Sequence, residues 1–168
     1  HWATGADVSE AVMEEWISLT GKVARIHFKF TYTGTVSHPR AHQELPALYV
    51  DNQLATLVYY RGNAPWTRGE LVRKSPASTN EYDGLDESWA AFVDEQNRGL
   101  GIYTPGTTQS TRFRVPGPSG PSGSGCSYIA PIRTMAITPG LVFEYDAYLI
   151  PGTLQEIREA VYEIGRAH

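Results

Sequence analysis

Residues 23–33 follow a two-residue alternation that predicts a β-strand with one buried face and one wet face. The apolar side carries Ala24, Ile26, Phe28, Phe30 and Tyr32, and the polar side carries Arg25, His27, Lys29 and Thr31. Successive side chains of an extended strand point to opposite faces, and an antiparallel sheet commonly exposes one face to water. Residues 141–149 repeat the pattern. The chain is therefore expected to form an antiparallel β architecture.

Further short alternating runs predict more strands, and 16 Gly and 11 Pro residues supply the turns between them. We expect strands over 45–50 and 54–60, joined as a hairpin at 51–53, and strands over 87–94 and 100–103. Residues 107–115 are expected to form an edge strand, and residues 126–137 a strand that Pro131 bulges or places at an edge. Residues 67–84 are expected to be a long surface connection, and the composition of residues 8–15 allows a helix.

The last element is predicted to be a helix that begins after Thr153. Thr153 and Glu156 have the spacing of a capping box, in which each side chain satisfies a free amide at the helix start. An apolar stripe at helical spacing follows, made of Leu154, Ile157, Val161 and Ile164. The expected fold is an all-β antiparallel sandwich with one C-terminal α-helix packed on it. We expect residues 1–168 to form a single domain, excised from a larger protein.

Charge and hydropathy exclude some classes of partner. The formal net charge is −4 and the isoelectric point is near 5.7, whereas nucleic-acid binding needs a basic face. No apolar run approaches the roughly 20 residues of a membrane-spanning helix. We therefore expect neither nucleic acid nor membrane as a partner. The single Cys126 cannot form an intrachain disulfide and says little about compartment.

His42 and Glu44 are the first candidate site, within the polar run 38–44. They are two residues apart, so an extended backbone places both side chains on one face. An imidazole beside a carboxylate could be a general acid/base pair, a pair of metal ligands or a polar clamp for a sugar. It could equally be an ordinary surface hydrogen bond.

An aromatic loop after the strand over 54–60 is the second candidate site. Its residues are Tyr59, Tyr60, Arg61 and Trp66, and Trp89 and Tyr103 are added as further ligand-binding rings. Exposed rings stack on sugar faces, because sugar C–H groups meet the negative face of the ring while hydroxyls reach nearby polar groups. The ordinary alternative is that Tyr59 or Tyr60 lies in the core and Trp66 anchors the loop.

Two smaller patterns complete the candidates. Glu144 and Asp146 share a strand face and could do acid/base work, although such carboxylates more often pair with cations such as Lys29 or Arg133. Gly99 and Gly101 leave one strand face bare, so that another group can approach closely.

Three phrases of the sequence resemble a family of secreted bacterial proteins. The phrases are residues 42–47, residues 89–94 with 99–105, and residues 143–149 before the capped helix. They resemble the C-terminal half of a poorly characterised group associated with polysaccharide degradation and with galactose-mutarotase-like β-supersandwiches, over about residues 13–164. The resemblance implies a β-sandwich, a carbohydrate ligand, a secreted location, extracellular or periplasmic, and a preceding β-rich half.

The leading functional hypothesis is a domain that binds polysaccharide or oligosaccharide through surface aromatics. The first alternative is a sugar-active hydrolase, lyase or epimerase that uses His42 and Glu44. A second is a copper oxidase in which His1 forms a histidine brace with His27, His38 or His42, as in lytic polysaccharide monooxygenases. A third is a structural domain that pairs with a second copy or with a missing N-terminal half. The identity of any cofactor is left open.

Overall fold

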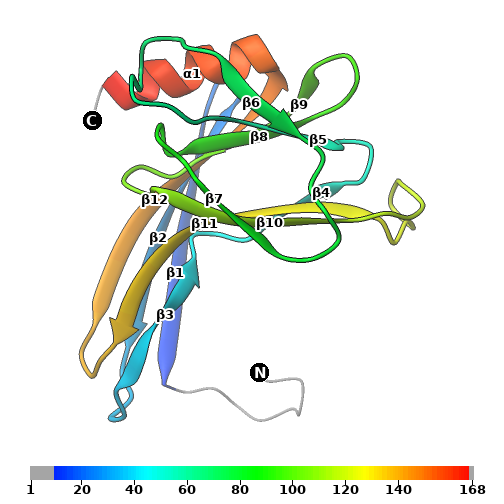
Figure 1. Cartoon of the computed structure of the whole chain (residues 1–168). Helices are drawn as coiled ribbons and strands as arrows, with labels where there is room; N and C mark the ends of the chain where they lie inside the picture. The colour runs from blue at the N-terminus through cyan, green and yellow to red at the C-terminus, as the bar shows by residue number, and fades with distance from the viewer. Residues whose placement is uncertain (1–9, 167–168) are drawn as a thin grey trace.

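The computed structural model describes residues 10–166, which form two antiparallel sheets and one helix (Figure 1). The larger sheet has seven strands in the spatial order β1, β2, β12, β9, β8, β5, β6. Their bounds are β1 Ala11–Thr20, β2 Val23–Tyr32, β12 Val142–Thr153, β9 Arg98–Tyr103, β8 Trp89–Val93, β5 Thr56–Tyr60 and β6 Leu71–Lys74.

The smaller sheet has five strands, ordered β3, β11, β10, β7, with β4 pairing beside β3 along the same edge of β11. Their bounds are β3 His38–Glu44, β4 Leu48–Asp51, β7 Glu81–Gly84, β10 Gln109–Val115 and β11 Cys126–Ile137. Together with helix α1 (Leu154–Arg166), the two sheets confirm the predicted all-β sandwich with one C-terminal helix.

The main core lies between the two sheets. Leu57, Phe92 and Ile102 of the larger sheet pack in one buried cluster with Ile129 of β11, and Leu48 and Val50 of β4 pack against this cluster. Because side chains alternate along a strand, this contact fixes which residues of the smaller sheet point outward. The outward-pointing residues include Tyr128, the neighbour of Ile129.

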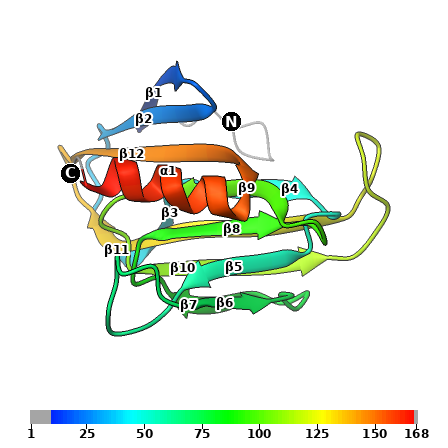
Figure 2. The same cartoon turned by 90° about the horizontal axis from the view of Figure 1, so that it is seen from above.

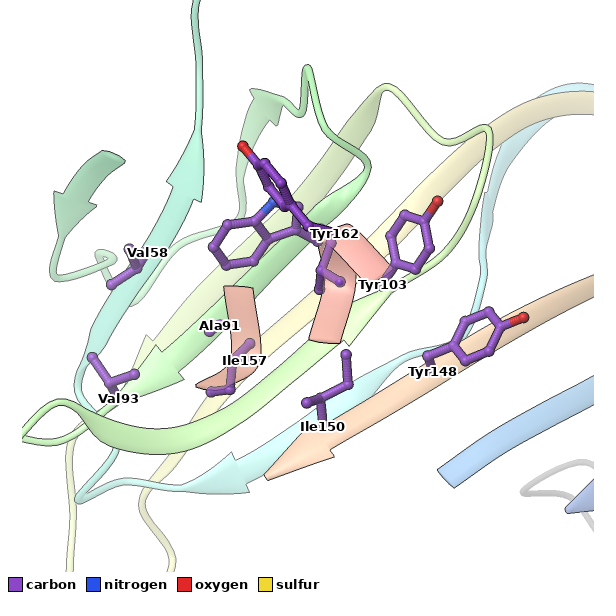
Figure 3. Close-up of a cluster of buried hydrophobic side chains, with 10 residues drawn as sticks. Val58, Ala91, Val93, Tyr103, Tyr148, Ile150, Ile157 and Tyr162 are labelled. Atoms are coloured by element: carbon purple, nitrogen blue, oxygen red, sulfur yellow. The ribbon is translucent and has the colours of Figure 1, made fainter. Parts of the chain in front are cut away.

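A second core lies between the larger sheet and α1, which covers β8, β9 and β12 when seen from above (Figure 2). Tyr103 and Ile150 project from the strands towards Ile157 and Tyr162 of the helix (Figure 3), and Trp89 belongs to the same buried cluster. The bare strand face predicted at Gly101 is what admits the helix, since a Cβ there would lie 2.4 Å from Cγ2 of Ile157. The larger sheet is therefore buried on both faces around β8.

The predicted capping box is confirmed. The backbone N–H of Thr153 donates to the Glu156 carboxylate at 2.8 Å, and the N–H of Glu156 donates to the Thr153 hydroxyl at 3.3 Å. These contacts satisfy amides at the helix start that have no partner within the helix.

Several local predictions were wrong. Strands β4 and β5 are not a hairpin, because β4 pairs with β11 in one sheet and β5 pairs with β8 in the other. Residues 67–84 contain β6 and β7 rather than a structureless connection. Residues 11–15 belong to β1, not to a helix, and residues 8 and 9 lie outside the described range.

The positions of β10 and β11 also differ from the prediction. β10 lies between β11 and β7 and is not an edge strand. β11 runs through Pro131, and its irregularity falls at 135–137 instead. The Pro131 carbonyl accepts a hydrogen bond from Leu45 N at 2.8 Å. The N–H and C=O groups of one residue point to the same side of a strand. The side on which Pro131 has no N–H to donate is therefore the side of β3 and β4, at the gap between these two strands.

Candidate functional site

The outward side of the smaller sheet carries a cluster of aromatic and polar side chains. Tyr128 lies opposite Tyr49 of β4 and Phe113 of β10, so the three rings share one face. We call this surface the outer aromatic face and define it by Tyr49, Tyr82, Phe113, Tyr128, His42 and Glu44.

The rings of this face form a continuous patch. The Phe113 and Tyr128 rings stack with centroids 4.4 Å apart, and the Tyr49 ring lies 4.7 Å from that of Tyr128. Tyr128 is buried beneath its neighbours, whereas Tyr49 is 61% exposed and Tyr82 is 50% exposed. The patch therefore offers two accessible rings on a rigid floor of packed ones.

His42 and Glu44 lie on the rim of the patch, on the same face of β3 as the sequence predicted. The His42 ring is 5.4 Å from the Tyr82 ring, and its Nδ1 is 2.8 Å from the Thr134 hydroxyl. Glu44 accepts a hydrogen bond from the Tyr128 hydroxyl. Burial is the largest cause that raises the pKa of Tyr128 well above its usual range, and the hydrogen bond to Glu44 is the second. The phenol therefore stays protonated and can donate this hydrogen bond.

Four of the six residues predicted to bind a ligand are not at the surface. Tyr59, Tyr60, Trp89 and Tyr103 are all no more than 5% exposed and belong to the cores. This arrangement agrees with the ordinary alternative, in which the tyrosines at the end of β5 are core residues.

Trp66 is exposed but lies away from the outer aromatic face. Its ring packs edge-on against Tyr103 and against Tyr162 of α1, at 6.2 and 5.3 Å, which places it on the helix side of the larger sheet. Arg61 is also exposed and pairs with Asp86 at 3.1 Å. Its guanidinium lies against Gly84 of β7, on the side of that strand that also carries Tyr82. The structure therefore separates Trp66, but not Arg61, from the layer that carries His42 and Glu44.

Glu144 and Asp146 pair with groups of β2. Asp146 contacts Arg25 at 3.0 Å and His27 Nδ1 at 3.1 Å, and Glu144 lies 3.5 Å from His27 Nε2. Burial acts to raise the pKa of Asp146, but the hydrogen bonds from Arg25 and His27 outweigh it, so the pKa falls below its usual value. The carboxylate is thus held ionised as part of a salt-bridged strand face, although with different partners from those proposed from the sequence.

The three histidines among residues 10–166 each contact a neighbouring side chain. His27 binds Asp146, His38 Nε2 lies 3.0 Å from the Tyr32 hydroxyl, and His42 binds Thr134. Across residues 10–166, no group of three or more His, Cys, Asp or Glu side chains is placed to hold a metal ion. His1 lies outside the described residues, so the copper hypothesis stays a prediction.

Four rings of the outer aromatic face were not picked out from the sequence. Tyr82 falls in the segment expected to be an irregular connection, and Tyr128 falls in a strand whose outward side was unknown. The alternation of Leu48, Tyr49 and Val50 did signal that Tyr49 points away from its apolar neighbours. Nothing local showed that the four rings converge, because they come from four different strands.

No protein-family model matches the chain, and no curated protein sequence matches it. Within residues 10–166, the structure has no helix with the length and apolarity that crossing a membrane requires.

Proposed function

We propose that the protein binds carbohydrate on the outer aromatic face of the smaller sheet. The observation that supports this most directly is the pair of exposed rings, Tyr49 and Tyr82, set on a floor of stacked rings with His42 and Glu44 at the rim. Apart from His42 and Glu44, the proposal uses different residues from those selected from the sequence.

The chemistry of a sugar matches this surface. Its C–H groups pack on the ring faces, and its hydroxyls both donate and accept hydrogen bonds. The Glu44 carboxylate accepts hydrogen bonds, and the guanidinium of Arg40, next along the same side of β3, donates them. The rigid β-sheet support means that few side chains need to be ordered when a ligand binds.

Affinity electrophoresis on gels containing plant and microbial polysaccharides tests the proposal. We expect retardation by at least one glycan, and roughly threefold to tenfold weaker binding for Tyr49→Ala and for Tyr82→Ala. Trp66→Ala is the matched control, an exposed ring on the helix side of the larger sheet, and should bind like the wild type.

Two outcomes would contradict the proposal. One is the absence of retardation on every glycan. The other is a loss of binding in Trp66→Ala but not in Tyr49→Ala, which would return the site to the aromatic loop after β5.

A sugar-active enzyme is the second candidate, favoured by one contact. Tyr128 and Glu44 share a hydrogen bond beside His42, so a protonated phenol, a carboxylate and an imidazole occur on one face. In this role His42 would transfer a proton to or from the sugar. Incubation with each retarded glycan, followed by a reducing-end or unsaturated-product assay, tests it. Equal product formation by His42→Ala and the wild type would exclude His42 from the chemistry.

A further inference from the structure

Strand β1 is an edge strand with large apolar side chains on both faces. The exposed residues are Val12, Met13, Trp16, Ile17 and Leu19, with exposures from 49% to 75%. Val12 and Trp16 lie on the helix side of the sheet with His27, whereas Met13, Ile17 and Leu19 lie on the opposite side. Within the described residues the strand therefore lacks a partner along its edge. Its faces are only partly covered, since Met13 lines a cavity with Gln43 and Met135 of the smaller sheet.

The other edge strands carry features that prevent edge-to-edge pairing, and β1 does not. β6 has only four residues and ends in Arg73 and Lys74, and β3 contains Pro39 and Arg40. β1 has ten residues, contains no Lys, Arg or Pro, and pairs with β2 without a register shift. Short length, charged side chains (Lys above all), proline and bulges are the usual protections of an edge. The only charges of β1 are Glu14 and Glu15, and Glu14 pairs with Lys29 at 3.8 Å. β1 is therefore built more like a strand that has a neighbour.

The backbone shows which groups β1 offers to such a neighbour. Thr33 N donates to the Glu10 carbonyl at 2.8 Å, so the even-numbered residues of β1 direct their N–H and C=O groups towards β2. The odd-numbered residues, including Met13, Glu15, Ile17 and Leu19, direct theirs towards the open edge.

We propose that the occupant is β1 of a second copy of this chain, paired antiparallel about a two-fold axis at Trp16. Hydrogen-bonded pairs across the new edge must join odd-numbered residues of the two copies. An axis at Trp16 pairs Met13 with Leu19 of the second copy and Glu15 with Ile17 of the second copy. The two-fold symmetry repeats each of these pairs once more on the other side of the axis. Met13 and Leu19 are apolar, and no like charges lie opposite each other. Two neighbouring symmetric registers compete with this one. An axis at Glu15 would place Glu15 against Glu15, which is unfavourable. An axis at Ile17 would place Met13 opposite Gly21, which lies in the turn beyond β1, so the ladder would be shorter.

The charges around Trp16 fit the same register. Glu14 would lie opposite Ser18 of the second copy. On its other side, Ser18 lies opposite Arg25 of the neighbouring strand β2. Ser18 is small, so the Glu14 carboxylate can extend over it towards a guanidinium that is half exposed. A hollow lined by Trp16, Ile17, Ser18, Arg25 and His27 lies at this place. The Glu14 carboxylate of one copy is thus directed towards the Arg25 guanidinium of the other, and the two-fold axis repeats this contact.

Analytical ultracentrifugation over a wide range of concentration tests whether the second copy is present. We expect the wild type to sediment as a dimer and Ile17→Lys to sediment as a monomer. Val36→Lys replaces another exposed apolar side chain, outside β1, and should remain a dimer. A wild type that is monomeric at every concentration, or an Ile17→Lys variant that dimerises like the wild type, would overturn the proposal.

Disulfide trapping tests the register. In a Cys126→Ser background, Trp16→Cys should oxidise to a covalent dimer, because residues paired on the axis have Cα atoms about 4.5 Å apart, within the range of a disulfide. Ser18→Cys is the matched control on the same face, since its copies would lie about 13 Å apart. Equal trapping at both positions, or trapping at neither, would overturn the pairing at Trp16.

Discussion

The hydroxyl of Tyr128 donates a hydrogen bond to the carboxylate of Glu44, although the two residues are 84 positions apart in the sequence. The contact joins the buried centre of the outer aromatic face to its acidic rim. It also fixes the orientation of the Tyr128 ring on which Phe113 and Tyr49 pack. The shape of the proposed binding surface thus depends on one buried phenol.

Tyr128→Phe should lower the free energy of unfolding by about 1.5–2 kcal/mol, because it removes a hydrogen bond to a charged group while keeping the ring. Urea unfolding followed by fluorescence measures the change. Tyr82→Phe, at an exposed position of the same face, is the control and should change stability by less than about 0.5 kcal/mol. Equal stability of Tyr128→Phe and the wild type would show that the contact adds nothing to the fold.

Glu87→Ala should be strongly destabilising, because the buried Glu87 carboxylate accepts three hydrogen bonds. They come from Trp66 N at 2.7 Å, Trp89 Nε1 at 2.8 Å and the Tyr162 hydroxyl at 2.6 Å. Its removal leaves these donors unpaired where α1 meets the sheet, at a cost of about 3 kcal/mol. Thermal unfolding measures the loss, and Glu95→Ala, an exposed change, should leave the transition almost unmoved. A small effect at Glu87 would mean that water replaces the carboxylate.

Arg112 is a buried cation that contacts Asp83 at 2.5 Å and Glu81 at 3.2 Å. Arg112→Met should cost about 3 kcal/mol, because it leaves Glu81 without its cation and leaves Asp83 with Lys74, at 3.0 Å, as its remaining partner. The double variant Arg112→Met with Asp83→Asn should recover part of this loss, since the stranded charge is then removed. Urea unfolding of both single variants and the double variant measures the coupling. Strictly additive losses would contradict an ion pair between Arg112 and Asp83.

Glu156 predicts a dependence of stability on acid pH. The hydrogen bond from Lys22, and those from Thr153, lower the pKa of Glu156 from 4.5 to about 2. A carboxyl group with a lowered pKa in the folded state stabilises that state at pH values above its unfolded pKa, and this contribution is lost as the pH falls towards the folded pKa. The wild type should therefore be more stable than Glu156→Gln above about pH 5.

The stability difference between the wild type and Glu156→Gln should shrink steadily as the pH is lowered from about 5 to about 2. Urea midpoints of the two proteins across this range measure it. Lys22→Ala should reduce the difference at neutral pH, because it removes the largest cause of the pKa shift. A difference that stays constant with pH would rule out Glu156 as the titrating group.

The sequence was sufficient for features that depend on neighbouring residues. Alternation over 23–33 and 141–149 identified β2 and β12, and the spacing of Thr153 and Glu156 identified the start of α1. It also placed His42 and Glu44 on one face. Each of these features follows from backbone geometry over a few residues, so local patterns carry it.

The burial of the predicted binding rings could be read only in part. β8 is apolar at five consecutive positions, which is the pattern of a strand covered on both faces. This pattern is typical of a core strand, although Trp89 was predicted to be a ligand-binding ring. The pattern does not reveal what covers each face, and here sheet and helix cover opposite sides.

The tertiary structure alone decided which strands pair and which rings meet. Local signals cannot distinguish a hairpin from a crossover, so β4 and β5 were joined in the prediction although they belong to different sheets. Tyr49, Tyr82, Phe113 and Tyr128 come from four strands, and only the strand order brings them together. By itself the sequence determined the long alternating strands such as β2 and β12, the helix and the side of the strand on which His42 and Glu44 lie. Their aromatic surroundings were decided by long-range pairing, because contacts between distant residues depend on the packing of the whole chain.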